Sequence, residues 1–229
     1  MAKFPARGDD HDVAVLEATT LGLAMACGIT VPTFFLHKVP TGHALVLQRF
    51  DRAGAIDQEK RLHYLSASAL MNVAYEDNTG GSYVGLAQVL RRISAEPEAD
   101  LHELYRRMVF NLVVGNSDDH VKNHGVLLVG KGNYRLAPAF DLVMQLNGNI
   151  GYQLLAILPG RAEASLALAR QAAPQFGLSA ANAEVIISHI SETVQGHTHV
   201  TLKAHGADAA LIKRVRDFLD RQRERITAD

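Results

Sequence analysis

The chain has 229 residues, of which 48% are hydrophobic, and its formal net charge at pH 7 is −1. That composition supplies a packed core, whether the chain forms one large domain or two modest ones. The near-neutral charge provides no basic surface for nucleic acid, the single cysteine excludes a disulfide framework, and no apolar run approaches the ~20 residues that span a bilayer.

The start of the chain predicts a short strand followed by a helix. Lys3 stands between apolar residues, and a helix is predicted from Val13 to Cys27, with Asp12 as its N-cap and Gly28 as its stop. Because Cys27 falls on the apolar face of this helix, we expect a buried thiol. With no secretory signal before it, this favours a soluble protein of the reducing cytoplasm.

A hairpin is predicted next. Its strand-like runs are Thr33 to His37 and Ala44 to Phe50, with Pro40-Thr41-Gly42 as the turn between them. Such a hairpin is typical of the small lobe of a kinase, in which the end of the second strand is the hinge. Backbone groups of Gln48 and Phe50 would there bind an adenine edge between apolar walls. The alternative interpretation is an edge strand that ends in a charged surface turn.

Past this hairpin the patterns are mainly helical. Helices are predicted at Leu62–Ala74, Val84–Ile93, Asp100–Val114, Arg161–Ala173, Ser179–Val194 and Asp208–Ile226. A further hairpin is predicted at Gly125–Val129 and Tyr134–Leu136. Turn residues predict loops at Asp77–Ser82 and Val143–Pro159 and a connection at Gly196–His205. Asp100 is the candidate N-cap of its helix.

Two polar groups near the end of the chain are interpreted as surface. The basic residues of the last predicted helix alternate with acidic ones, which is typical of a solvated face. Four histidines precede that helix with no Cys or carboxylate at ligand spacing, so we expect surface histidines and no metal centre. They are His189, His197, His199 and His205.

The most informative motif runs from Asn116 to Asn123 and is followed by Asp141. Phosphoryl transfer needs one carboxylate to orient the attacking hydroxyl and oxygen ligands for magnesium ions. Asp118 and Asn123 have the D-x-x-x-x-N spacing with which kinases place the base and a metal-binding Asn on one loop, and Asp141 follows the second hairpin. The alternative is a polar loop whose Asp and Asn side chains satisfy turn backbone.

The residues upstream of this motif stand in the order that kinases use. A Lys on a strand, paired with a Glu on the next helix, holds the α- and β-phosphates of ATP. Glu17 lies 14 residues after Lys3, inside the first predicted helix. We therefore expect Lys3 and Glu17 to form an exposed ion pair.

With these motifs the chain resembles the HipA family of bacterial serine/threonine kinases, the toxins of toxin–antitoxin pairs. The residues that carry the resemblance lie between Lys3 and Leu142, and the helical remainder fits less specifically. They are Lys3-Phe4-Pro5, Asp10 to Val13 with Glu17, Gly28 to Pro32, Gln48 to Arg52, Gly115 to Asn123 and Ala137 to Leu142.

The resemblance implies an α+β, protein-kinase-like fold. Residues 1–50 would be a truncated small β lobe and residues 51–229 a mainly helical large lobe. It also implies Asp118 as the catalytic base, ATP and Mg²⁺ as cofactors, and Asn123 with Asp141 as the metal ligands. His120 and Lys122 would line the nucleotide pocket or, alternatively, only support the loop. The implied ATP-binding set is Lys3, Glu17, Gln48, Arg49, Phe50, His120, Lys122, Asn123 and Asp141.

The same resemblance implies transfer of the ATP γ-phosphoryl to a protein serine or threonine hydroxyl. It points to an aminoacyl-tRNA synthetase as substrate and to a DNA-binding antitoxin as partner, while the chain itself would bind neither nucleic acid nor membrane. A small-molecule phosphotransferase is one alternative, although such enzymes usually carry a His where Asn116 stands. A catalytically incomplete pseudokinase or regulatory binding module is another, because family members carry a phosphate-covering loop before the Lys-bearing strand and only Met1 and Ala2 precede Lys3.

Overall fold

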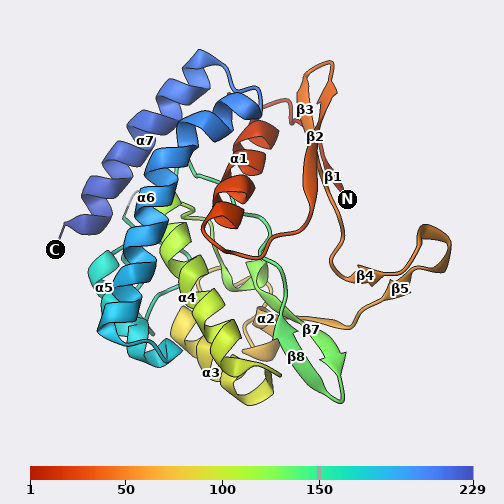
Figure 1. Ribbon diagram of the computed structural model, residues 1–229, viewed down its shortest axis with the longest axis vertical. Coiled ribbons are helices and arrows are strands. Elements are labelled where there is room, and N and C mark those ends of the chain that lie inside the picture. The colour runs from red at the N-terminus through yellow and green to blue at the C-terminus, as the bar shows by residue number, and fades with distance from the viewer. Residues whose placement is uncertain (149–150, 229) are drawn as a thin grey trace.

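Three short strands near the start of the chain form an antiparallel sheet beside helix α1 (Figure 1). The computed structural model describes residues 1–148 and 151–228. The strands are β1 (Ala2–Lys3), β2 (Phe34–Val39) and β3 (Gly42–Leu47), in the order β1-β3-β2. Lys3 pairs with Leu45 and Phe34 with Leu47, so the middle strand β3 fixes the register of both neighbours. The predicted hairpin is confirmed, with its boundaries shifted by a few residues.

Helix α1 (Val13–Ala26) lies between this sheet and helix α6 (Ala180–Ala204) (Figure 1). Its predicted ends are confirmed: Asp12 Oδ1 accepts a hydrogen bond from the Val15 N–H at 3.1 Å, and Gly28 follows with φ of 73°. Cys27, at the C-cap, is a buried free thiol as expected.

Helix α4 (Pro97–Val114) is the centre of the helical part, because it contacts α3, α5, α6 and α7. The remaining helices are α2 (Ala67–Leu70), α3 (Tyr83–Ile93), α5 (Leu166–Ala172), α7 (Ala209–Thr227) and the 3₁₀ turns η1 (Ile56–Gln58), η2 (Val121–Asn123) and η3 (Ala173–Phe176). Helices α3, α5 and α7 pack around α4, whereas α2 lies beside a second sheet and η1 in a small two-stranded ribbon (Figure 1). Within the described ranges, no helix is both long and apolar enough to cross a membrane.

Two strands of a second antiparallel sheet lie between the Asn116–Asn123 motif and Asp141 in the sequence. Its strands β6 (Tyr64–Ser66), β7 (Gly125–Gly130) and β8 (Asn133–Leu136) lie in that order. The β7–β8 hairpin confirms the prediction and leads from the loop after α4 toward Asp141. Strands β4 (Arg52–Ala53) and β5 (Lys60–Arg61) form a small ribbon that projects from the rest of the chain (Figure 1).

The predicted helix Leu62–Ala74 is wrong. Residues 64–66 are strand β6, which pairs with β7, and only the single-turn helix α2 follows. The apolar spacing suited a helix, but the backbone of this segment finds partners on a strand some sixty residues later, as in Tyr64 opposite Leu127. Ser66 caps the short helix by accepting from the Ala69 N–H at 3.2 Å.

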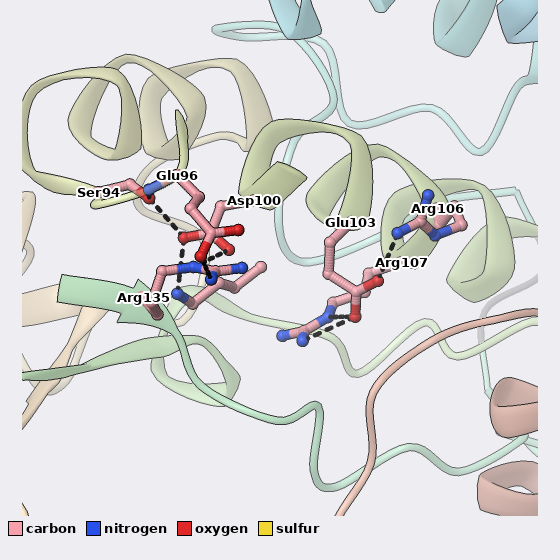
Figure 2. A network of polar contacts seen from close by, with 8 residues as sticks. Ser94, Glu96, Asp100, Glu103, Arg106, Arg107 and Arg135 are labelled. Atoms are coloured by element: carbon pink, nitrogen blue, oxygen red, sulfur yellow. Dashed lines mark hydrogen bonds and ion pairs between the residues drawn. The ribbon is translucent and has the colours of Figure 1, made fainter. Parts of the chain in front are cut away.

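Asp100 is not the cap of α4, which starts three residues earlier at Pro97. Its buried carboxylate instead accepts from the Ser94 hydroxyl at 2.6 Å and from the Leu136 N–H at 2.9 Å, and it pairs with Arg135. Figure 2 shows Asp100 beside Ser94 and Arg135, and its contacts with Arg135 and Leu136 tie α4 to strand β8. Asp100 thus makes tertiary contacts with strand β8 in addition to its local contact with Ser94, and it does not cap the helix.

Two other helix boundaries differ from the predictions. Helix α6 continues through the expected connection Gly196–His205, because a single glycine lowers helix propensity by only about 1 kcal/mol. The helix expected from Arg161 begins at Leu166, after the Ser165 cap, because Arg161 is held in a turn by a bridge to Leu158.

The last predicted helix is confirmed, and three of the four histidines are exposed as expected. Helix α7 starts after the cap Asp208, close to its prediction. His189, His197 and His199 are exposed, as expected. His205 is half-buried, because its Nδ1 lies 3.1 Å from Thr19 Oγ1 and its ring contacts Phe34 edge-on.

Candidate active site

Lys3 joins three segments that are far apart in the sequence. Its ammonium lies 2.7 Å from Glu17 Oε1 and 2.7 Å from Asp141 Oδ1. Lys3 lies on strand β1, where it pairs with Leu45 of β3, and Glu17 lies on α1. The expected contact between Lys3 and Glu17 is confirmed, but not as an exposed pair, because the Glu17 side chain is only 3% exposed.

Burial and charge act in opposite directions on this cluster. Burial raises the pKa of the Glu17 carboxyl, and the Lys3 ammonium only partly opposes that rise. Burial also lowers the pKa of Lys3, but the carboxylates of Glu17 and Asp141 together outweigh it, so that the Lys3 pKa ends above its ordinary value. Lys3 is therefore a fixed cation at neutral pH.

The loop after α4 presents one carboxylate to solvent and hides the next. Gly115 ends the helix in the left-handed region, with φ of 67°, and turns the chain into the loop. Asp118 is exposed, whereas Asp119 is only 1% exposed. Of the two adjacent residues, only Asp118 is accessible to a hydroxyl group from solvent.

The buried Asp119 belongs to a polar network that the sequence analysis missed. Its carboxylate accepts a hydrogen bond from the Tyr83 hydroxyl and contacts His124 Nε2 at 3.1 Å. Asn111 Nδ2 donates to the Tyr83 hydroxyl at 2.9 Å, and Asn116 Nδ2 donates to Asn111 Oδ1 at 3.2 Å. The one signal in the sequence was Asn111, a polar residue in the apolar final turns of a predicted helix.

Asn123 and Asp141, the expected metal ligands, lie at the two ends of the β7–β8 hairpin. Asn123 is 8% exposed at the end of η2, and Asp141 is 47% exposed by its side chain. Asp141 also has φ of 59°, a conformation that costs a non-glycine residue free energy and is often found at functional sites. Both supply oxygen atoms, the donors that Mg²⁺ prefers.

These donors fit a magnesium ion that arrives with a nucleotide better than a resident metal. Among the residues that the structure describes, no group of three or more His, Cys, Asp and Glu side chains could hold a metal ion. Mg²⁺ is often bound by one or two carboxylates together with substrate phosphates. Asn123 and Asp141 could therefore complete the coordination of such an ion.

Phe50, at the end of the expected hinge, connects it to the segment of Asp141. The Phe50 ring lies 5.5 Å from the Phe140 ring and 5.9 Å from the Tyr64 ring, between centroids. The Gln48 N–H donates to the Thr33 carbonyl at 2.8 Å, so this donor is engaged within the sheet and is not free for an adenine edge. The exposed Arg49 is paired with Asp51 at 2.6 Å.

Lys122 and His120 lie on the loop between Asp118 and Asn123. Lys122 Nζ donates to the Tyr75 carbonyl at 2.9 Å and to Asn78 Oδ1, and it lies 4.7 Å from the centroid of the Tyr75 ring. Lys122 thus anchors the loop expected at residues 77–82. The Nδ1 atom of His120 is buried without a hydrogen-bond partner in the described part of the chain.

The fold and these contacts together define a kinase-like protein, and comparisons with known proteins identify its family. The family model of the HipA-like C-terminal domain matches residues 1–198. The chain belongs to this family, and the expected membership is confirmed.

Two solved structures share the fold. The HipA chain of the Shewanella oneidensis MR-1 toxin–antitoxin system, in a complex with HipB and operator DNA, has a TM-score of 0.78 at 16% identity, with 98% of this chain and 57% of that chain covered. The Helicobacter pylori proinflammatory kinase CtkA has a TM-score of 0.70 at 14% identity, with 98% and 84% covered. The α+β, protein-kinase-like fold class is therefore confirmed.

Curated relatives are named as kinases. A Sinorhizobium fredii protein named "Putative kinase Y4mE" is 31% identical over 148 residues, which are 62% of this chain and 34% of that protein. "Putative kinase Y4dM" of the same species is 26% identical over 78% of this chain and 42% of its own length. The chain thus spans about a third to two fifths of the length of these relatives.

Proposed function

We propose that this chain contains the catalytic site of an ATP-dependent serine/threonine kinase. The observation that carries the proposal is the position of the Lys3 ammonium, 2.7 Å from both Glu17 and Asp141. A fixed cation between a buried helix carboxylate and an exposed carboxylate is the arrangement that protein kinases need to hold nucleotide phosphates beside a metal ligand. The kinase names of the relatives support the same reaction class.

Each residue has a distinct task in this proposal. The exposed Asp118 carboxylate accepts a hydrogen bond from the substrate hydroxyl and orients its oxygen toward the γ-phosphorus. Lys3, held by Glu17, binds the α- and β-phosphates. The oxygen atoms of Asn123 and Asp141 hold Mg²⁺, which when bound neutralises charge on the phosphate oxygens. Catalysis then consists of positioning and charge stabilisation.

Lys122 adds a second cation to this site. Its hydrogen-bond and ring partners within the described residues are a carbonyl, an amide oxygen and an aromatic ring, all of which are neutral. Hydrogen bonds within its own loop lower the pKa of the Asp77 carboxyl, and the Lys122 charge also helps to lower it. A lysine that is held in place without a carboxylate in contact keeps its charge available for an anion. We propose that Lys122, with His120 beside it, faces the phosphates, and that Phe50, Arg49 and the Gln48 carbonyl surround the adenine.

The biological setting is a proposal at the same level. The family resemblance points to a toxin of a toxin–antitoxin pair that acts in the cytoplasm on an aminoacyl-tRNA synthetase. The Shewanella HipA structure, which contains HipB and operator DNA, supports an antitoxin as the partner. In such an assembly the antitoxin would contact DNA, because this chain has a net charge of −1.

Titration calorimetry with MgATP tests the assignment of roles. We expect Asp141→Ala to weaken binding by roughly 10-fold or more, because it removes a metal ligand. Asp118→Ala should leave binding nearly unchanged and abolish transfer from labelled ATP to protein. Asp220→Ala, an exposed position on α7, is the control.

Each outcome of these experiments has a clear meaning. Equal loss of affinity in the Asp141 and Asp118 variants, with both folded, would remove the assigned roles. Nucleotide binding without any turnover would favour a pseudokinase or binding module. Transfer to a small alcohol but not to protein would favour a small-molecule phosphotransferase.

A further inference from the structure

We propose that Asp119 is a positioning residue, which holds the loop of Asp118 and Asn123 in its active shape through Tyr83 and His124. The inference rests on the proposed function, because it explains how the two residues assigned to the reaction keep their places. Asp119 itself is covered by its neighbours and cannot reach a substrate.

The Asp119 carboxylate is held on both of its oxygen atoms. The Tyr83 hydroxyl donates to Oδ2, and His124 Nε2 lies 3.1 Å from Oδ1 and 3.3 Å from Oδ2. The rings of Tyr83 and His124 meet edge to face, with centroids 5.4 Å apart. Burial, and secondarily the Asp119 charge, raises the pKa of the Tyr83 hydroxyl well above its ordinary value, so that it remains a donor.

The contact with His124 closes the catalytic loop on itself. Asp119 and His124 flank residues 120–123, so a hydrogen bond between their side chains clips the two ends of this short segment together. Inside it, the Asn123 N–H donates to the His120 carbonyl at 2.9 Å. Asn123 lies between Asp119 and His124, and Asp118 directly precedes Asp119. The hydrogen bond between Asp119 and His124 therefore limits how far apart Asp118 and Asn123 can move.

Tyr83 attaches the closed loop to the helices behind it. It is the first residue of α3, and its hydroxyl accepts from Asn111 of α4 at 2.9 Å. The segment after Asp141 is attached as well: the Leu155 N–H donates to the Asp119 carbonyl at 2.8 Å, and the Tyr83 N–H donates to the Ala156 carbonyl at 2.9 Å. Asp119 therefore connects the catalytic loop to two helices and to this segment.

Simple packing does not explain this arrangement. A buried carboxylate loses its hydration, which apolar residues at the same place would avoid. The network also leaves His124 Nδ1 without a hydrogen-bond partner among the described residues, so it is not an optimum of stability. Directional hydrogen bonds specify one conformation of a loop more narrowly than apolar contacts do, which is what a catalytic loop requires.

Tyr83→Phe tests the inference, and Tyr105→Phe is a matched control. Both tyrosines are fully buried, and each variant removes one hydroxyl group. Tyr83→Phe removes two buried hydrogen bonds, one to Asp119 and one from Asn111, whereas Tyr105→Phe removes one. The Tyr105 hydroxyl, however, donates to the Ala169 carbonyl, away from the catalytic loop. We expect Tyr83→Phe to melt at a lower temperature than Tyr105→Phe, because it removes two hydrogen bonds, one of them to a carboxylate. Amide hydrogen exchange confined to residues 117–124 should become roughly 10-fold faster only in Tyr83→Phe.

Phosphoryl transfer is the second readout. We expect Tyr83→Phe to lower kcat by roughly 10- to 100-fold with a smaller rise in KM for ATP, because the loop of Asp118 and Asn123 loses its geometry while the Lys3 cluster is untouched. Tyr105→Phe should change neither constant. Asp119→Asn, which keeps an acceptor for Tyr83, should fall between wild type and Tyr83→Phe.

The two readouts separate this inference from the proposed function. Hydrogen exchange does not depend on activity, so faster exchange confined to residues 117–124 supports the positioning role even if the wild-type chain transfers no phosphate. Equal loop exchange in the two Phe variants overturns the role. Faster loop exchange in Tyr83→Phe with an unchanged kcat overturns it as well, because the loop shape would then not matter to the reaction.

Discussion

Glu17 is a buried carboxylate whose one cationic partner among the described residues, Lys3, also contacts the exposed carboxylate of Asp141. The Glu17 side chain is 3% exposed, whereas that of Lys3 is 35% exposed and keeps Asp141 as a second partner. Removing one member of a fully buried ion pair leaves an unpaired buried charge and is costly. If Glu17 loses its charge, the Lys3 ammonium keeps its contact with water and with Asp141. The loss in the free energy of unfolding should therefore be close to that of breaking a surface ion pair.

We predict that Glu17→Gln changes the free energy of unfolding by no more than about 1 kcal/mol. The neutral amide oxygen holds the Lys3 ammonium less firmly than a carboxylate does, so phosphoryl transfer should fall by roughly 10-fold or more. Thermal melting and transfer from labelled ATP measure the two effects. Glu192→Gln, an exposed position on α6, is the control, and unaltered transfer in Glu17→Gln would count against the role of Glu17.

Cys27 yields a prediction about reactivity. Burial raises the pKa of its thiol to about 12, and the thiolate is the nucleophilic form. We expect an aromatic disulfide reagent at pH 8 to leave Cys27 unmodified in the folded chain and to modify it fully in urea. Rapid stoichiometric labelling of the folded protein would show that this thiol is accessible and that α1 opens readily.

At the scale of elements, α7 packs against the end of α4, where the catalytic loop begins. Gly115 ends α4 with φ of 67°, and a Cβ atom placed there would lie 2.5 Å from Phe218 Cζ of α7. Gln222, one turn later on α7, donates to the Leu112 carbonyl at 2.7 Å and so satisfies the end of α4. A distant helix therefore supports the point at which the loop begins.

We predict that Gly115→Ala destabilises the chain by about 2–4 kcal/mol, from left-handed backbone strain and overpacking against Phe218 together. Gly177→Ala is the matched control. It has a similar φ of 76°, but the nearest atom to its Cβ would be His102 Nε2 at 4.0 Å, so it should cost only about 1–2 kcal/mol. Urea unfolding compares the two, and equal losses would show that the contact with Phe218 gives way without cost.

The elements that could be predicted are those whose signals are local. The Asp12 cap, the Gly28 stop and the β7–β8 hairpin depend on neighbouring residues, and each is present. Strand β6 was missed because its partner lies far along the chain. Asp100 was misassigned because its partners, apart from Ser94, lie on β8.

In the candidate site, too, local sequence signals could be predicted and contacts between distant segments could not. The spacing of Asp118 and Asn123 could be read from the motif, and the order of Lys3 and Glu17 predicted their contact. The support of Asp119 by Tyr83 could not be predicted, because Tyr83 reaches the loop only through packing of α3 against α4. Adjacent aspartates can be separated into accessible and buried ones only when the loop is folded.

Across the whole molecule, folding raises the pKa of several acidic groups. Burial raises the pKa of the Cys27 thiol and of the Tyr64 hydroxyl, each to about 12, and it raises the pKa of the Tyr83 and Tyr105 hydroxyls further above their ordinary value. These groups lie at the end of α1 and on β6, α3 and α4, so the effect is spread over most of the core. The pKa of Lys3 is also raised.

We predict that stability falls steeply as the pH rises from about 9 toward 12. A group whose pKa is higher in the folded chain than in the unfolded one contributes stability that is complete below its unfolded pKa, ordinarily 9.0 for Cys27 and 10.0 for Tyr64, and is lost as the pH approaches the folded value of about 12. Each unit of difference is worth about 1.4 kcal/mol. Urea unfolding at pH 7, 9, 10 and 11 measures the slope, and Tyr105→Phe should make it shallower by removing one such group. A free energy of unfolding that is constant from pH 9 to 11 would mean that these groups titrate alike in both states and are not shielded by the core.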